Sequence, residues 1–152
     1  MDKALTGAAG EHYVAFRLSA LGYPIGLTTR GTRAADLLAS NPETGKSIIV
    51  QIKTMRNAFA ENKKSGSYWH WRISSSRPKP KDTLYYVFVD LKDDAQKSPD
   101  VFIIPSLKIK PPLLVEYTNY IGIAIYERDK KAKKAYFNRW DIIEEALDPN
   151  PT

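Results

Sequence analysis

The stretch S-I-I-V-Q-I-K-T, residues 47–54, constrains the fold more than any other part of the sequence. Apolar residues stand at every second position from Ile48 to Ile52, and they fall on one face of an extended strand because successive side chains point to opposite faces. Gln51 and Lys53 lie side by side on the other face. We therefore expect a central strand with one face buried in the core and functional side chains on the opposite face.

A turn precedes this strand and indicates a hairpin. The segment S-N-P-E-T-G-K, residues 40–46, contains a proline that fixes φ and a glycine that tolerates positive φ, which is typical of a turn. The short apolar run A-A-D-L-L-A before it is therefore expected to pair antiparallel with the strand. If the loop is centred between residues 43 and 44, paired positions sum to about 86 or 87, so Asp36 lies opposite Val50 or Gln51.

The other periodicities predict a mixed α+β sheet with helices packed on it. A helix is expected from Leu5 to Leu21, with Thr6 as its cap and Glu11 beside its apolar stripe. The near-continuous apolar run 84–91 is typical of a central strand buried on both faces. Residues 1–152 are expected to form one domain. Three later elements are expected: a strand at 101–105, a strand or a helix end at 121–126, and a helix at 139–147.

The composition excludes several classes of site. The 152 residues contain no cysteine, so a disulfide framework, a thiolate metal site and a cysteine nucleophile are excluded. The two histidines, His12 and His70, are too few for a typical zinc cluster. No apolar run approaches the length of a membrane span, and the first ten residues lack the apolar middle of a signal peptide. We therefore expect a soluble, cytoplasmic protein with no membrane partner.

Positive charge is concentrated in one segment. The formal net charge is +6, and residues 53–81 contain eight basic residues against one acid. This distribution favours a nucleic-acid partner, with DNA as the expected one. The polar composition of 54–82 predicts loops around one short strand. The candidate nucleic-acid-binding residues are Arg30, Arg33, Arg56, Lys63, Lys64, Trp69, Arg77, Lys79 and Lys81.

Four polar residues can share one patch if the hairpin and the first helix pack together. Glu11 on a core-facing stripe needs a partner, because an unpaired buried charge costs several kcal/mol. With Asp36 and Gln51 it supplies hard oxygen ligands, which suit Mg²⁺ or Mn²⁺. Such an ion lowers the pKa of a bound water, while Lys53 orients the nucleophile or stabilises a phosphoryl anion. The patch therefore has the outline of a phosphodiester hydrolysis site.

These residues resemble the PD-(D/E)xK nuclease superfamily. The pattern consists of G-E at 10–11, D at 36 and Q-I-K at 51–53 after an apolar strand, and it is similar to the Q-x-K variants found in Mrr-like restriction endonucleases and some homing endonucleases. The resemblance implies a restriction-endonuclease-like αβββαβ core and a magnesium-dependent endodeoxyribonuclease.

In that resemblance each residue has a role. Asp36 is the principal metal ligand, with the Gln51 amide oxygen and the Ile52 carbonyl beside it. Glu11 assists metal binding, directly or through a water, and Lys53 is the catalytic lysine. Ala35 stands where the family has proline, and Gln51 removes one negative charge from the site. Paired cuts in both strands of a duplex would require a homodimer.

Simpler interpretations stay open for each feature. Asp36 and Lys53 could form a cross-strand ion pair, and Trp69 with Trp71 could belong to a strand that covers the core. The lysines at 130–134 are expected in a solvated turn, and the segment from Arg77 to Lys81 is either an extended linker or a DNA contact. Loss of catalysis would leave a nuclease-fold module that binds nucleic acid or another protein.

Overall fold

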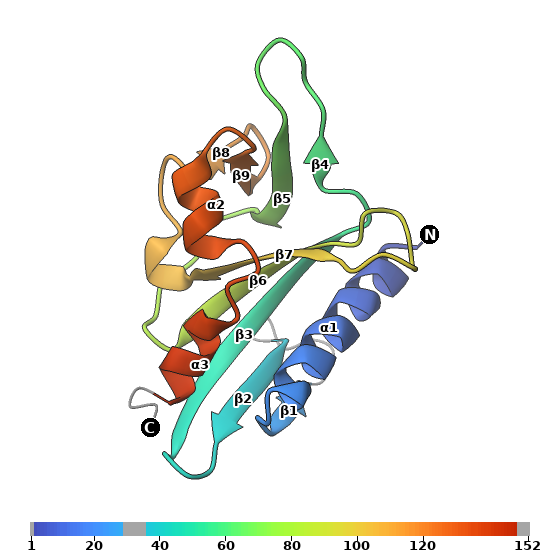
Figure 1. Ribbon diagram of the computed structural model, residues 1–152. Helices are drawn as coiled ribbons and strands as arrows, with labels where there is room; N and C mark the ends of the chain where they lie inside the picture. Colours follow the sequence, from blue (N-terminus) through green and yellow to red (C-terminus); the bar gives the residue numbers. More distant parts are fainter. Residues whose placement is uncertain (1, 29–35, 149–152) are drawn as a thin grey trace.

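The computed structural model describes residues 2–28 and 36–148, which form two β-sheets and flanking helices (Figure 1). The larger sheet, sheet A, has the order β1-β2-β3-β6-β7, and the smaller, sheet B, has the order β4-β5-β9-β8. The strands of sheet A are β1 Ile25–Leu27, β2 Leu37–Asn41, β3 Lys46–Met55, β6 Leu84–Asp90 and β7 Asp100–Pro105. The strands of sheet B are β4 Phe59–Ala60, β5 Tyr68–Ser74, β8 Leu114–Glu116 and β9 Ile121–Tyr126. The helices are α1 Lys3–Ala20, the 3-10 helix η1 Ser106–Lys108, α2 Lys130–Tyr136 and α3 Asp141–Leu147.

The first helix is confirmed, but it begins earlier than expected. Asp2 caps α1 by accepting a hydrogen bond from the Ala4 N–H, whereas the expected cap, Thr6, lies inside the helix and is buried. Asp2 is the better cap because a carboxylate accepts hydrogen bonds from the free N–H groups of the first turn. Gly22, at φ +97°, follows the end of the helix as expected.

The hairpin of β2 and β3 is also confirmed. The register pairs Leu37 with Val50 and Asn41 with Lys46, so paired positions sum to 87. Gly45 in the connecting turn has φ +72°, which explains why a glycine stands there. The ladder ends at Leu37, and the Asp36 N–H before it donates to the Val50 carbonyl, one of the two expected neighbours of Asp36. The end of β2 therefore places Asp36 beside the middle of β3.

Strand β6 occupies the interior of sheet A. It pairs in parallel with β3 and antiparallel with β7, and it is almost fully buried, as its apolar sequence predicts. Helices α1 and α3 cover one face of the sheet, where Val14, Ile143 and Leu147 pack on Val50 and its neighbours in one core cluster (Figure 1). The mixed α+β fold class is therefore confirmed.

Sheet B packs against the opposite face of sheet A. Trp71 is completely buried and its indole N–H donates to the Val89 carbonyl of β6, and Trp69 is 8% exposed. Their burial makes them core residues, which is one of the two interpretations that the sequence allowed. Instead of loops around one short strand, the 54–82 segment therefore contains the β4–β5 hairpin. This hairpin, rather than a helix, lies between the parallel strands β3 and β6.

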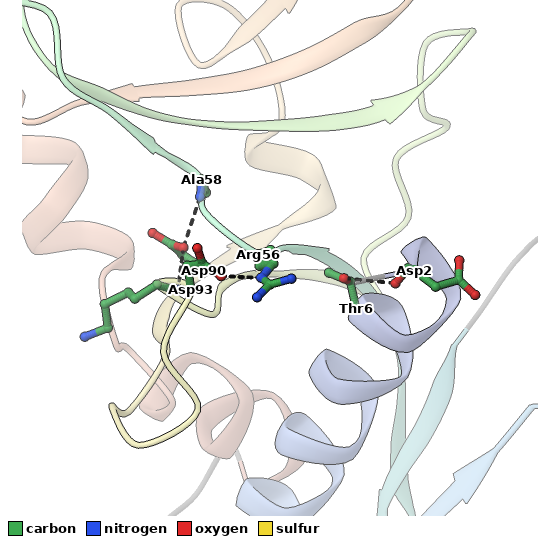
Figure 2. Close-up of polar contacts among 7 residues, drawn as sticks. Asp2, Thr6, Arg56, Ala58, Asp90 and Asp93 are labelled. Atoms are coloured by element: carbon green, nitrogen blue, oxygen red, sulfur yellow. Dashed lines mark hydrogen bonds and ion pairs between the residues drawn. The ribbon is translucent and has the colours of Figure 1, made fainter.

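A buried carboxylate fixes the point where the chain leaves sheet A for sheet B (Figure 2). Asp90, at the end of β6, is 0% exposed and accepts hydrogen bonds from the N–H groups of Ala58 at 3.0 Å and Lys92 at 2.9 Å. Beside it Arg56 forms an ion pair with Asp93. These contacts connect the end of β3 to the end of β6, and so position β4 relative to sheet A.

The C-terminal part differs from expectation in one element. The lysines at 130–134 lie in helix α2, not in a turn, and Asp129 caps this helix by accepting from the Ala132 N–H at 3.0 Å. Residues 121–126 are strand β9, which decides between the two alternatives for that segment. Among the described residues, no helix combines the length and the apolar composition needed to cross a membrane.

Candidate functional site

Gln51 and Lys53 face a cleft between the two sheets. Both side chains are partly buried, while their strand neighbours Val50 and Ile52 are buried under α1 on the other face. The cleft has a volume of about 480 Å³. Its floor is sheet A, and its opposite wall is the end of β5 and the segment that follows. It is lined by Ile49, Gln51, Lys53, Ile73, Ser74, Ser76, Arg77, Pro78, Lys79, Lys81, Leu84 and Tyr86.

Asp36 is positioned by the end of strand β2. Its N–H donates to the Val50 carbonyl at 3.1 Å, and its carbonyl accepts from the N–H of Thr28 at 3.3 Å. One of its carboxylate oxygens, Oδ2, accepts the Ile52 N–H at 2.6 Å. The Asp36 carboxylate thus accepts a β3 backbone N–H that the backbone of one more β2 residue would otherwise bind. A carboxylate has lone pairs on both oxygens, so this bond is compatible with a cation on the same side chain.

The same hydrogen bond indicates where the Ile52 carbonyl points. The N–H and C=O of one residue in a strand point to the same edge, because antiparallel partners exchange both bonds. The Ile52 N–H is directed at Asp36, so the Ile52 carbonyl points toward the β2 side of β3 as well. The Asp36 carboxylate, the Ile52 carbonyl and the Gln51 side chain therefore lie around one stretch of β3.

Lys53 is electrostatically coupled to this group. Burial lowers the pKa of its ammonium group below the usual lysine value, and the negative charge of Asp36 opposes that change. The Lys53 ammonium group is thus partly desolvated, and it interacts electrostatically with the Asp36 carboxylate. A desolvated ammonium interacts more strongly with an anion in the cleft than an exposed one does, because the local dielectric constant is lower.

Glu11 lies on the helix-covered face of the sheet, not in the cleft. Gly10 beside it meets Thr54 of β3 so closely that an added Cβ would overlap the threonine side chain. Ala9 and Tyr13 face a hollow on the β6 side of the helix. At 100° per residue, Glu11 lies on the flank of α1 opposite to that hollow. Glu11 is partly buried on the side of β3 opposite to the face that carries Gln51 and Lys53.

The chemistry of the donor set fits a hard divalent cation. A carboxylate, an amide oxygen and a backbone carbonyl are ligands that Mg²⁺ and Mn²⁺ accept, together with water. Residues 2–28 and 36–148 contain no group of three or more His, Cys, Asp or Glu side chains that could hold a metal. An ion at Asp36 would therefore depend on the neutral oxygens of Gln51 and Ile52.

The predicted nucleic-acid-binding residues fall into separate groups. Arg77, Lys79 and Lys81 line the cleft. Lys63 and Lys64 are exposed between β4 and β5, at a distance along the chain from the cleft wall. Arg30 and Arg33 lie outside the described residues.

Two of these predictions do not fit the cleft. Arg56 lines a different hollow, between α1 and residues 91–99, where Asp93 neutralises it. Trp69 packs against Phe59, Phe102 and Phe137 in the interior, so it presents no face for a base to stack on. The reason is the strand alternation of β5, which directs the tryptophans inward and their neighbours outward.

The structure also adds residues that the sequence did not indicate. Ser74, Ser76 and Tyr86 line the cleft. Ser106, which is 3% exposed, accepts the Lys81 N–H at 2.9 Å and donates to the Lys81 carbonyl at 2.5 Å. This pair of bonds anchors the C-terminal end of the basic wall. It joins segments 25 residues apart, so no local pattern could have indicated it.

Comparison with solved structures finds an endonuclease of similar fold. The match is to the bacterial homing endonuclease I-Ssp6803I, with a TM-score of 0.64 over 97% of this chain and 95% of that chain, at 16% sequence identity. No protein-family model matches the sequence, and no curated protein matches it either. At this identity the similarity concerns the fold, and it shows that the chain has an endonuclease-like α+β architecture.

Proposed function

We propose that this protein is a metal-dependent nuclease of the PD-(D/E)xK superfamily, Q-x-K variant, that hydrolyses phosphodiester bonds in DNA. The observation that carries the proposal is the hydrogen bond from the Ile52 N–H to Asp36. It brings a carboxylate, a backbone carbonyl and the Gln51 amide to one stretch of β3, next to the partly desolvated Lys53. The endonuclease-like fold of the whole chain supports the same conclusion.

Each residue has a role in this proposal. Asp36, Gln51 and the Ile52 carbonyl would hold Mg²⁺ or Mn²⁺, with Glu11 assisting from α1. The bound ion supplies a water of lowered pKa and stabilises charge on a phosphoryl oxygen. The Lys53 ammonium orients that water or stabilises the developing anion. Arg77, Lys79 and Lys81 form the basic wall of the cleft, where they meet the phosphate backbone.

Plasmid cleavage in Mg²⁺ and in Mn²⁺ tests this function. Asp36→Ala and Lys53→Ala should each lower the cleavage rate by at least about a hundredfold, the usual scale for losing one positioned catalytic group. The matched controls are Asp94→Ala and Lys46→Ala, which remove the same charges outside the cleft. Equal rates in wild type, site variants and controls would show that any cleavage comes from a contaminant.

Gln51 supports a second candidate, a nuclease-fold module that binds nucleic acid without cutting it. A neutral amide gives the ion one negative charge less than the usual second acid, so metal affinity is reduced. Gln51→Glu restores that charge and distinguishes the two. An active enzyme should need less Mg²⁺ for half-maximal cleavage after the change, whereas DNA binding with no cleavage in either form supports the module.

A further inference from the structure

The outer face of sheet B carries aromatic and basic residues. Tyr68, His70 and Arg72 alternate with the buried tryptophans of β5, so they point away from the core. Tyr117 and Tyr120 come from the turn between β8 and β9, and they contact the same face. We call this surface, made by Tyr68, His70, Arg72, Tyr117, Tyr120, Tyr126 and Arg128, the tyrosine face.

The tyrosine face is organised as two ring pairs, each with one arginine, and for brevity we call both of them stacks. In the first, Tyr117 and Tyr120 lie nearly parallel, with ring centroids 4.6 Å apart, and the Arg72 guanidinium lies over the Tyr120 ring at 5.1 Å. In the second, the Tyr68 and Tyr126 rings are tilted by 44° with centroids 5.4 Å apart, and the Arg128 guanidinium lies over Tyr126 at 4.6 Å. Each stack thus combines aromatic rings with one cation.

The rings of the tyrosine face are partly exposed, and Tyr117 is the most exposed of them. Gly122 of β9 lies beneath them, and a Cβ there would meet His70 Nε2 at 3.0 Å and the Tyr117 ring at 3.2 Å. The glycine therefore allows both rings to lie close to the strand. Tyr117 is 38% exposed, and Arg72 and Arg128 are exposed. Burial and the neighbouring tyrosine hydroxyls raise the pKa of Tyr117, so its hydroxyl stays neutral beside an anion.

The face meets the rim of the cleft at the end of strand β5, where the register shifts between Arg72 and Ser74. Ser74, near the end of that strand, lines the cleft, and Arg72 precedes it by two residues, about 7 Å along the strand. The second stack lies four residues before Arg72, about 13 Å along the same strand. Arg77, on the cleft wall, connects the two surfaces by its 2.5 Å ion pair with Glu116 of β8.

From these observations we infer that the tyrosine face binds the unpaired nucleotides of a nucleic-acid strand that enters the cleft. Bases stack on aromatic rings, and arginines placed beside the rings meet the phosphates. The two ring pairs supply both groups, and Arg72 lies two residues before Ser74, which lines the cleft together with Gln51 and Lys53. The inference rests on the proposed nuclease function and names a substrate class for it, namely a duplex with a single-stranded extension.

Fluorescence anisotropy in EDTA, where cleavage is suppressed, tests the inference. The probes are a fluorescein-labelled blunt duplex, the same duplex with a single-stranded DNA extension, and the same duplex with an RNA extension. Wild type should bind one or both extended probes more tightly than the blunt one. Tyr117→Ala and Arg72→Ala should each weaken binding of the extended probe by about five- to tenfold and leave blunt binding within about twofold.

Matched control variants distinguish a loss at the tyrosine face from the loss of any exposed ring or positive charge. Phe16→Ala removes an aromatic ring that is 65% exposed on α1, and Lys108→Ala removes an exposed cation from η1; neither should change the preference. Tyr117→Phe should retain it, because the ring remains. Thermal unfolding of each variant identifies those that fail to fold, and Arg72→Gln then replaces any such variant.

The outcomes separate this inference from the proposed function. Plasmid cleavage that depends on Lys53, combined with equal binding of blunt and extended probes, would overturn the inference and leave the nuclease intact. A preference for extended probes without any cleavage would overturn the nuclease function and leave the binding role of the tyrosine face intact. If the alanine variants lower the unfolding temperature but keep the preference, the tyrosine face is a packing cluster and the inference is wrong.

Discussion

Lys53 shows at the scale of one residue how stability and the proposed chemistry oppose each other. Its folded-state pKa is lowered mainly by burial, so the folded protein binds its proton less tightly than the unfolded chain does. Below the folded pKa the lysine is charged in both states, and burying that charge costs stability. The cost is relieved as pH rises through the folded pKa toward the unfolded value of 10.5.

We therefore predict that Lys53→Met raises the unfolding temperature at pH 7, by about 2–4 °C for each 1 kcal/mol of burial cost removed. The difference between variant and wild type should shrink as the pH approaches that of an ordinary lysine. Thermal unfolding followed by circular dichroism across this pH range measures both effects. Lys46→Met, at the exposed start of the same strand, is the control, and a constant difference at all pH values would contradict the prediction.

At the scale of elements, the contact between α1 and β3 positions one side of the site. Gly10 is buried against Thr54 without room for a side chain, whereas Gly7, in the same helix, has no neighbouring atom within 4 Å of an added Cβ. At Gly10, one residue before Glu11, α1 and β3 are therefore in close contact. A displacement of α1 at Gly10 would therefore move the Glu11 carboxylate as well.

This difference predicts opposite effects for two similar substitutions. Gly10→Ala should destabilise the fold by about 1–3 kcal/mol, because overpacking forces the helix away from β3. Gly7→Ala should stabilise it by about 0.5–1 kcal/mol, because alanine is the better helix former. Urea unfolding at equilibrium measures both free energies. Equal effects would mean that helix propensity, not the contact with Thr54, determines the outcome.

At the scale of the whole molecule, the position of positive charge matters more than its amount. Lys79 and Lys81 lie on the cleft wall, and Ser106 anchors the backbone of the second. Lys130 and Lys131 carry the same charge on the exposed start of α2. Exposed lysines on an unrelated surface add to the net charge but do not neutralise phosphates held in the cleft.

Salt dependence of DNA binding distinguishes these two pairs. The double variant Lys79→Ala, Lys81→Ala should reduce the slope of log K against log salt by about 1.8, which is about 0.9 for each lost phosphate contact. The double variant Lys130→Ala, Lys131→Ala should leave the slope nearly unchanged. Titrations of a short duplex at several salt concentrations give both slopes, and the same reduction in both variants would place the DNA elsewhere.

Local patterns in the sequence determined the β2–β3 hairpin and the two faces of β3. Side-chain alternation and turn chemistry act between near neighbours, so Asp36 could be predicted to lie opposite Val50 or Gln51, and its N–H donates to the Val50 carbonyl. The buried central strand β6 was predictable for the same reason, since an uninterrupted apolar run needs cover on both faces. The position of Gln51 and Lys53 on one face of β3 was predictable in the same way, because residues two apart in a strand point to the same side.

Only the tertiary structure decided what covers these elements and which charges share the cleft. The chain between β3 and β6 folds back as a hairpin, so Trp69 enters the core while Tyr68 and Arg72 turn outward. Arg56, three residues after Lys53, faces a different hollow, whereas Lys81, 28 residues away, lies in the cleft with it. The reason is physical: local propensity sets the direction of a side chain on its own element, but neighbours across the fold arise from long-range packing of apolar faces, and no short stretch of sequence contains both partners.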